Sequence, residues 1–140
     1  MSVNLKQRTV LALCLLAGLM DSSSGMLLMT APAFTMGLMQ LDVSTVELLV
    51  FIRFIGAFVF SVGMLYVFAW LQYLRSESWQ PVRAVLLMTA WVRLVICFFT
   101  AVAIATGDLP VGWASVTLTD GCLAALQLWI VLKEWVSRDD

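Results

Sequence analysis

The sequence predicts an all-α integral membrane protein, a bundle of four transmembrane helices. Hydrophobic residues make up 62% of the 140 residues and charged residues only 12%, which is far from the usual make-up of soluble domains. A helix needs about 20 mostly apolar residues to cross the roughly 30 Å hydrocarbon core of a bilayer. Four such stretches fill nearly the whole chain. We therefore expect a single transmembrane domain over residues 1–140, with no room for a soluble catalytic domain.

Local signals support the four spans, which cover about residues 9–31, 45–72, 82–106 and 112–136. Pro32 follows the first span, and Pro81 suits the first turn of the third helix. Ser44 followed three residues later by Glu47 is the pattern of a capping box, which predicts the start of the second helix.

Basic residues predict the direction of the spans. Six of the eight Lys and Arg residues lie at the chain ends or between the second and third helices: Lys6, Arg8, Arg75, Arg83, Lys133 and Arg138. The connections at 32–44 and 107–111 contain none. Because cytoplasmic loops carry an excess of Lys and Arg, we expect both termini in the cytoplasm.

The connection at 33–41, on the predicted outer side, is itself apolar. Phe34, Leu38 and Leu41 recur at helical spacing, which favours a short segment lying flat on the outer membrane surface over an irregular loop. Methionines gather around it, and their side chains suit an adaptable contact with another protein. The predicted partner-contact surface consists of Met26, Met29, Phe34, Met36, Leu38 and Met39.

The composition argues against several kinds of chemistry. The chain has no histidine, which is the commonest metal ligand and the usual haem ligand. Cys14, Cys97 and Cys122 lie in separate spans and form no CxxC pair, so no metal site is indicated. The net charge of −1 gives nucleic acid no basic surface to bind. No residue can be assigned as catalytic, and we expect no cofactor unless a lipid or quinone binds.

Each predicted span contains one charged residue well inside it: Asp21, Arg53, Arg93 and Asp120. A charge near a helix centre costs roughly 2.5–3.5 kcal/mol in a bilayer, so these residues are expected to face inward and to pair. Counted at about 1.5 Å per residue, all four reach a similar depth. Two negative and two positive charges can cancel there, and the sequence predicts an intramembrane charge cluster.

Two roles for this cluster are open. It can be a buried ionic network that fixes which helices are neighbours, or a site for proton or ion transport, a lipid headgroup or a quinone ring. Because Arg stays charged, only the two Asp residues can cycle between protonation states. Nearby hydroxyls can line a polar space or bond back to helix carbonyls: Ser22, Ser23, Ser24, Thr117 and Thr119.

The layout resembles the DoxX-like four-helix membrane proteins of bacteria. The points of likeness are Pro32, the apolar outer segment, Arg53 to Gly56, Arg93, and the pair Asp120 and Gly121. The resemblance implies the bacterial cytoplasmic (inner) membrane, and some members are membrane subunits tied to quinone-linked sulfur oxidation. It points to Arg53 and Asp120 for a quinone or headgroup contact.

Three functions remain as hypotheses. The first is a non-enzymatic accessory, structural or assembly subunit of a larger membrane protein complex, suggested by minimal loops and absent catalytic motifs. The second is a small membrane transporter or proton- or ion-coupled carrier that uses Asp21 or Asp120. The third is a quinone-binding redox helper. Self-association would supply the protein partner if no other subunit does.

Overall fold

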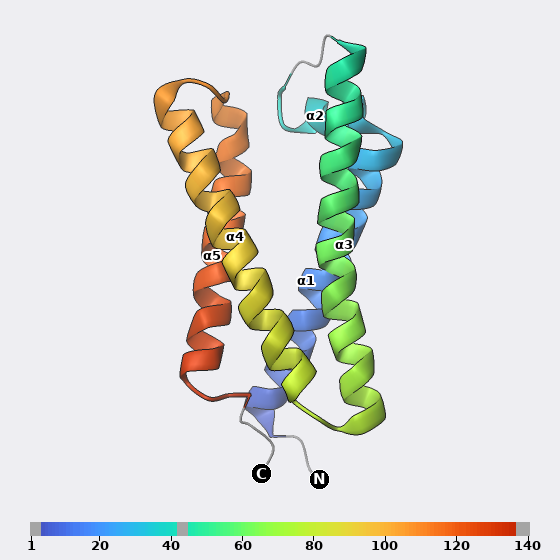
Figure 1. The fold of residues 1–140 in the computed structure, drawn as a ribbon, viewed down its shortest axis with the longest axis vertical. Coiled ribbons are helices and arrows are strands. Elements are labelled where there is room, and N and C mark those ends of the chain that lie inside the picture. The colour runs from blue at the N-terminus through green and yellow to red at the C-terminus, as the bar shows by residue number, and fades with distance from the viewer. Residues whose placement is uncertain (1–3, 42–44, 137–140) are drawn as a thin grey trace.

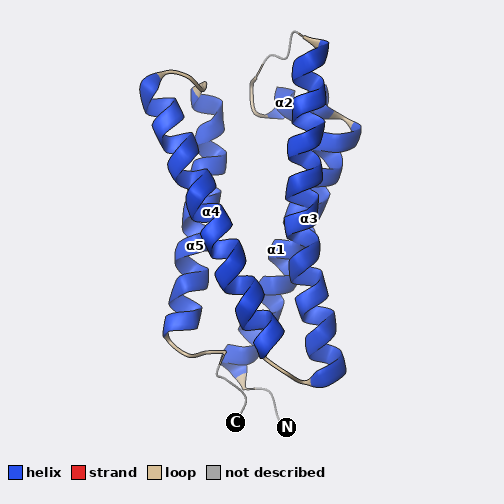
Figure 2. Ribbon diagram, viewed as in Figure 1, coloured by secondary structure: helices blue, strands red, loops and turns tan. Residues whose placement is uncertain are grey.

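The protein is helical almost throughout (Figures 1 and 2). The computed structural model describes residues 4–41 and 45–136. Its elements are α1 (Leu5–Thr30), α2 (Pro32–Leu38), α3 (Val46–Ser76), α4 (Gln80–Thr106), the 3-10 turn η1 (Val111–Trp113) and α5 (Ala114–Leu132). Within these ranges, four stretches are long and apolar enough to cross a membrane: α1, α3, α4 and η1 with α5. These four helices confirm the predicted all-α class and fit a multi-pass membrane protein.

Capping residues set where these helices begin. α1 starts at Leu5 because Asn4 and Gln7 form a capping box, each side chain accepting a hydrogen bond from the other residue's backbone N–H. α3 is capped by the hydroxyl of Thr45, which accepts from the amide of Leu48 at 3.3 Å. Ser44, the predicted cap, lies outside the described residues. α4 has Pro81 in its first turn, as predicted.

The ends of two helices differ from the predicted spans. α3 continues to Ser76 and stops where Glu77 adopts a left-handed conformation with φ 52°. α5 stops at Leu132, four residues short of the predicted end, and Glu134 nearby also has φ 52°. A left-handed residue cannot continue a right-handed helix, so polar residues end these helices even though apolar residues follow in the sequence.

The four long helices form two pairs. α1 packs mainly against α3, and α4 packs mainly against α5 (Figure 1). The pairs converge at the end that holds both termini, here called the terminal end, and separate toward the end that holds α2, here called the α2 end. The hydrophobic core lies in the terminal half, where residues of all four helices meet, among them Val10, Tyr66, Leu86 and Ile130.

Glycines allow α1 and α3 to approach backbone to backbone. A Cβ atom added to Gly25 would lie 2.4 Å from the backbone nitrogen of Phe60, and one added to Gly56 would lie 2.8 Å from the carbonyl oxygen of Gly25. Gly18 and Gly63 continue the same seam toward the terminal end. Small residues at such a seam are typical of helix pairs in membranes, where close van der Waals packing drives association. This seam fixes the rotation of α1 and hence the direction of Asp21.

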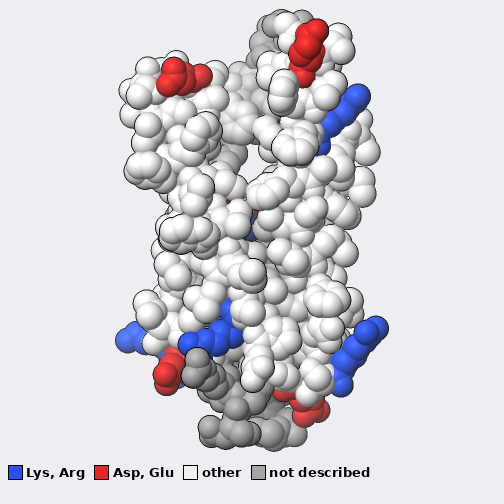
Figure 3. Space-filling view, viewed as in Figure 1, with Lys and Arg blue, Asp and Glu red and all other residues white. Residues whose placement is uncertain are grey.

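The outer surface of the molecule suits a lipid environment. Large apolar side chains are exposed along the long helices, including Phe68, Trp91 and Phe98. In Figure 3 the surface charges lie toward the two ends of the visible face, and uncharged residues cover the band between them. Exposed apolar surface on this scale is unfavourable in water and is expected in contact with lipid.

Candidate functional site

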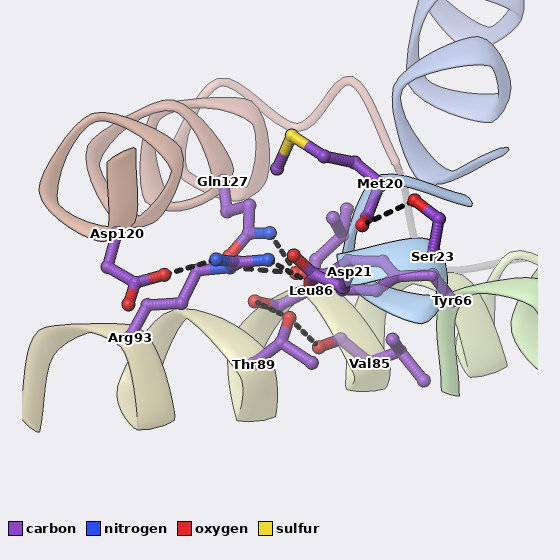
Figure 4. A network of polar contacts seen from close by, with 10 residues as sticks. All are labelled: Met20, Asp21, Ser23, Tyr66, Val85, Leu86, Thr89, Arg93, Asp120 and Gln127. Carbon is purple, nitrogen blue, oxygen red and sulfur yellow. Dashed lines mark hydrogen bonds and ion pairs between the residues drawn. The ribbon is translucent and has the colours of Figure 1, made fainter. Parts of the chain in front are cut away.

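The centre of the molecule holds a buried guanidinium between two carboxylates (Figure 4). Arg93 on α4 donates from Nη2 to Asp21 Oδ2 on α1 and from Nη1 to Asp120 Oδ1 on α5. All three side chains are buried. We call these three residues the charged triad. Hydrogen bonds between ionised partners are the strongest kind available, which is what a charge removed from water requires.

Two further polar side chains complete this network. Arg93 Nε donates to the hydroxyl oxygen of Tyr66 on α3 at 3.3 Å, and Gln127 Nε2 on α5 donates to the same oxygen. Both Tyr66 and Gln127 are fully buried. Each of the four long helices therefore contributes a polar group to one connected network. Neither residue was predicted as part of the site, although Gln127 lies inside an apolar helix, where an unpartnered amide is costly and so indicates a buried partner.

Arg53 does not join this network, so the prediction of a four-residue charge cluster is wrong in this respect. Its side chain is exposed and forms no ion pair with any residue in the described ranges. The reason is the length of α3: 31 residues span about 46 Å, well above the roughly 30 Å of a hydrocarbon core. Arg53 and Arg75 are 22 positions apart, about one bilayer thickness along the helix.

A groove lies between the two helix pairs and runs from the charged triad toward the α2 end. Its volume is about 750 Å³, and Figure 3 shows an opening between the pairs in this part of the molecule. Asp21, Arg93 and Asp120 line it, with Trp113 and residues of α2 near its mouth. Its aromatic lining residues are Phe51, Phe54, Phe58, Phe99 and Trp113. The groove thus combines apolar walls with a charged inner end.

Only two of the five predicted polar lining residues face this groove, namely Ser24 and Thr119. Ser22 lies in the seam between α1 and α3, where its Oγ has no hydrogen-bond partner among the described residues and packs against Gly63. Ser23 donates to the carbonyl of Met20 at 3.0 Å. The hydroxyls of Thr117 and Thr100 are 2.7 Å apart and join α5 to α4. Helix rotation separates these residues although they are neighbours in sequence.

The predicted partner-contact surface is divided between two faces. Met36 is buried, and both Met36 and Met39 line the groove. Phe34 and Leu38 on α2 are exposed, as is Met26 on α1, while Met29 is half-buried. α2 is a helix, as the spacing of apolar residues predicted, and its helical turn places Met36 opposite Phe34 and Leu38. The six residues therefore do not form one continuous surface.

The fold and the site together define a multi-pass helical membrane protein with a buried ionic network beside a groove. Comparison with protein-family models, with curated proteins and with solved structures finds no match for this chain.

Proposed function

We propose that this chain is a membrane-embedded binding protein, of the carrier type, for a lipid-soluble ligand with one polar end. The observation that supports the proposal is the groove of about 750 Å³ that ends on the charged triad. Sites for small ligands have volumes of about 300–1,000 Å³, mostly apolar walls and a few convergent polar groups. The groove has each of these properties.

A purely structural role for the triad does not account for the groove. An ionic network that only fixes helix neighbours needs buried partners and close packing around them. Protein interiors are packed as densely as organic crystals, with few voids larger than a water molecule. A large space directly beside Asp21 and Asp120 is therefore better explained by a ligand than by helix pairing alone.

The proposed setting is the bacterial cytoplasmic membrane, with both termini in the cytoplasm. The basic residues at the terminal end, among them Lys6, Arg75 and Arg83, support this orientation. The mouth of the groove would then face away from the cytoplasm. The DoxX-like resemblance is consistent with this setting and remains a prediction. We assign no catalytic role to the chain, because the network contains no nucleophile paired with a base.

Blocking the groove tests the proposal. Ser24 lines the groove, whereas the adjacent exposed Ser23 does not, so Ser24→Trp and Ser23→Trp form a matched pair. Each protein is purified in mild detergent and its extract analysed by mass spectrometry for lipid-soluble compounds. We expect a compound that the wild type and Ser23→Trp retain and that Ser24→Trp loses. Identical extracts from all three proteins would contradict the proposal.

A second candidate function is an accessory subunit of a larger membrane complex. Phe34 and Leu38, exposed on the side of α2 away from Met36, support it because they offer a small apolar contact at the α2 end. Purification of the tagged chain in mild detergent tests this candidate. Stoichiometric co-purification of other subunits, lost in the double variant Phe34→Ser/Leu38→Ser, is the expected result. A wild-type chain that elutes alone would exclude it.

A further inference from the structure

We infer that the ligand of the groove is a monovalent organic cation with an apolar body, and that it competes with a proton for the charged triad. This inference rests on the proposed binding function and adds the chemical class of the ligand. It depends on three independent features: the charge of the triad, the hydrogen-bonding atoms left free, and the aromatic walls.

The first feature is an excess of negative charge. Asp21 and Asp120 together carry two negative charges when ionised, and Arg93 supplies one positive charge. Arg53 cannot balance the remainder because it is exposed and does not line the groove. The fully ionised triad therefore has a net charge of −1 inside the bundle. An unbalanced buried charge is strongly unfavourable, so one further positive charge, from a proton or a ligand, is required for neutrality.

The second feature is that each carboxylate of the triad keeps one free acceptor oxygen. Each nitrogen of the Arg93 guanidinium donates one hydrogen bond, to Asp21, to Asp120 or to Tyr66, and one N–H remains on each Nη atom. Each carboxylate uses one oxygen for Arg93, and Asp21 Oδ1 and Asp120 Oδ2 have no hydrogen-bond partner among the described residues. Neither oxygen is fully buried, and both residues line the groove. A cation suits these oxygens because both are acceptors on negatively charged groups.

The third feature is the aromatic character of the walls. Phe51, Phe54 and Phe58 line one side from α3, and Phe99 of α4 and Trp113 of η1 line the other. Aromatic faces attract cations, and the attraction is stronger where water is excluded. The groove therefore offers an apolar body favourable contact along its length while the charge approaches the carboxylates.

Within residues 4–41 and 45–136, every charged or titratable group that faces this site belongs to the network already described. These groups are Asp21 on α1, Tyr66 on α3, Arg93 on α4 and Asp120 on α5, and α2 contributes none. Arg93 stays protonated. A proton bound by either carboxylate removes the negative charge that holds the cation, so acidification is expected to weaken cation binding.

Equilibrium dialysis with two probes of nearly equal shape and opposite charge tests the inference. The probes are tetraphenylphosphonium and tetraphenylborate, and the protein is the full chain in detergent, with protein-free micelles as the blank. We expect the phosphonium ion to bind, the borate ion to fail, and binding of the cation to weaken as the pH is lowered. Asp21→Asn and Asp120→Asn should each weaken cation binding by roughly tenfold or more, the loss of a charge-assisted contact.

The Ser24→Trp and Ser23→Trp pair gives an independent readout that leaves the triad unchanged, should an Asp variant fail to fold. Loss of phosphonium binding in Ser24→Trp alone supports the inference, and unchanged binding in both overturns it. Equal binding of the borate ion also overturns it. If neither probe binds but the wild type retains a compound that Ser24→Trp loses, the ligand class is wrong and the proposed binding function stands. If there is also no such compound, both fail.

Discussion

The Nε atom of Arg93 lies 3.3 Å from the hydroxyl oxygen of Tyr66, a residue 27 positions earlier in the chain. The same oxygen accepts a hydrogen bond from the amide of Gln127, so α3, α4 and α5 meet at one buried atom (Figure 4). Tyr66 also packs in the hydrophobic core of the terminal half. Tyr66 therefore connects the hydrophobic core to the charged triad, and its hydroxyl oxygen accepts the hydrogen bond from Nε of Arg93.

Replacement of Tyr66 by Phe should destabilise the protein by about 1–3 kcal/mol, because the buried amide of Gln127 and Nε of Arg93 each lose a partner. Thermal unfolding of the purified protein measures the loss. The double variant Tyr66→Phe/Gln127→Leu is the control. It should lose less than the sum of the single variants, because it leaves no unpaired amide. An unchanged melting temperature in Tyr66→Phe would show that the hydroxyl does not stabilise the network.

Arg93 and Arg53 should differ sharply when each is replaced by Gln. Arg93→Gln leaves two buried carboxylates without their cation and should cost about 3–5 kcal/mol. Arg53→Gln removes an exposed charge without a described partner and should cost no more than about 0.5 kcal/mol. Size-exclusion chromatography of fluorescent fusions, before and after heating, compares the folded fractions. Similar losses of folded protein in both variants would show that Arg53 belongs to the buried network.

The sequence could predict which segments cross a membrane, but it could not predict which side chains meet. Hydropathy depends on each residue alone, and so the four spans were visible. Pairing depends on how each helix is rotated about its axis, and this is set by contacts such as that between Gly25 and Phe60. The predicted depth of Arg53 is wrong because α3 is longer than the bilayer is thick. The end of such a helix does not mark the surface of the membrane. Tyr66 and Gln127 were not predicted because neither side chain carries a formal charge that demands a partner.

The glycine seam between α1 and α3 should be sensitive to a single methyl group. Gly25→Ala places a Cβ 2.4 Å from a backbone nitrogen that cannot move without separating the helices, and overpacking of this kind costs about 1–3 kcal/mol or more. Gly37 on α2 has no neighbouring atom within 4 Å of the added Cβ. Gly37→Ala should therefore be neutral or stabilising by up to about 1 kcal/mol. Thermal unfolding compares the two, and equal effects would argue against close packing at the seam.

The groove should be reached by water-soluble reagents, whereas the lipid-facing surface beside it should not. Thr119 lines the groove, and the adjacent Leu118 is exposed on another face of α5. In a background with Cys14, Cys97 and Cys122 replaced by Ala, a charged methanethiosulfonate should label most Thr119→Cys chains and few Leu118→Cys chains. The reason is that the thiolate is the reactive form and needs an aqueous environment. Mass spectrometry of intact protein quantifies the labelling, and the reverse order would contradict the position of the groove.

The spacing of the triad along the chain has a consequence for biosynthesis. Arg93 and Asp120 are 27 positions apart and can enter the membrane together in one helical hairpin, whereas Asp21 precedes Arg93 by 72 positions. At about 5–20 residues per second, the ribosome needs roughly 4–14 s to make the intervening chain. During that interval the nascent α1 exposes an acidic residue with no cation to pair with, at a cost of roughly 2.5–3.5 kcal/mol. The half-made protein therefore differs from the finished one by an unpaired intramembrane acid, and arrival of the second hairpin supplies the cation that pairs with it.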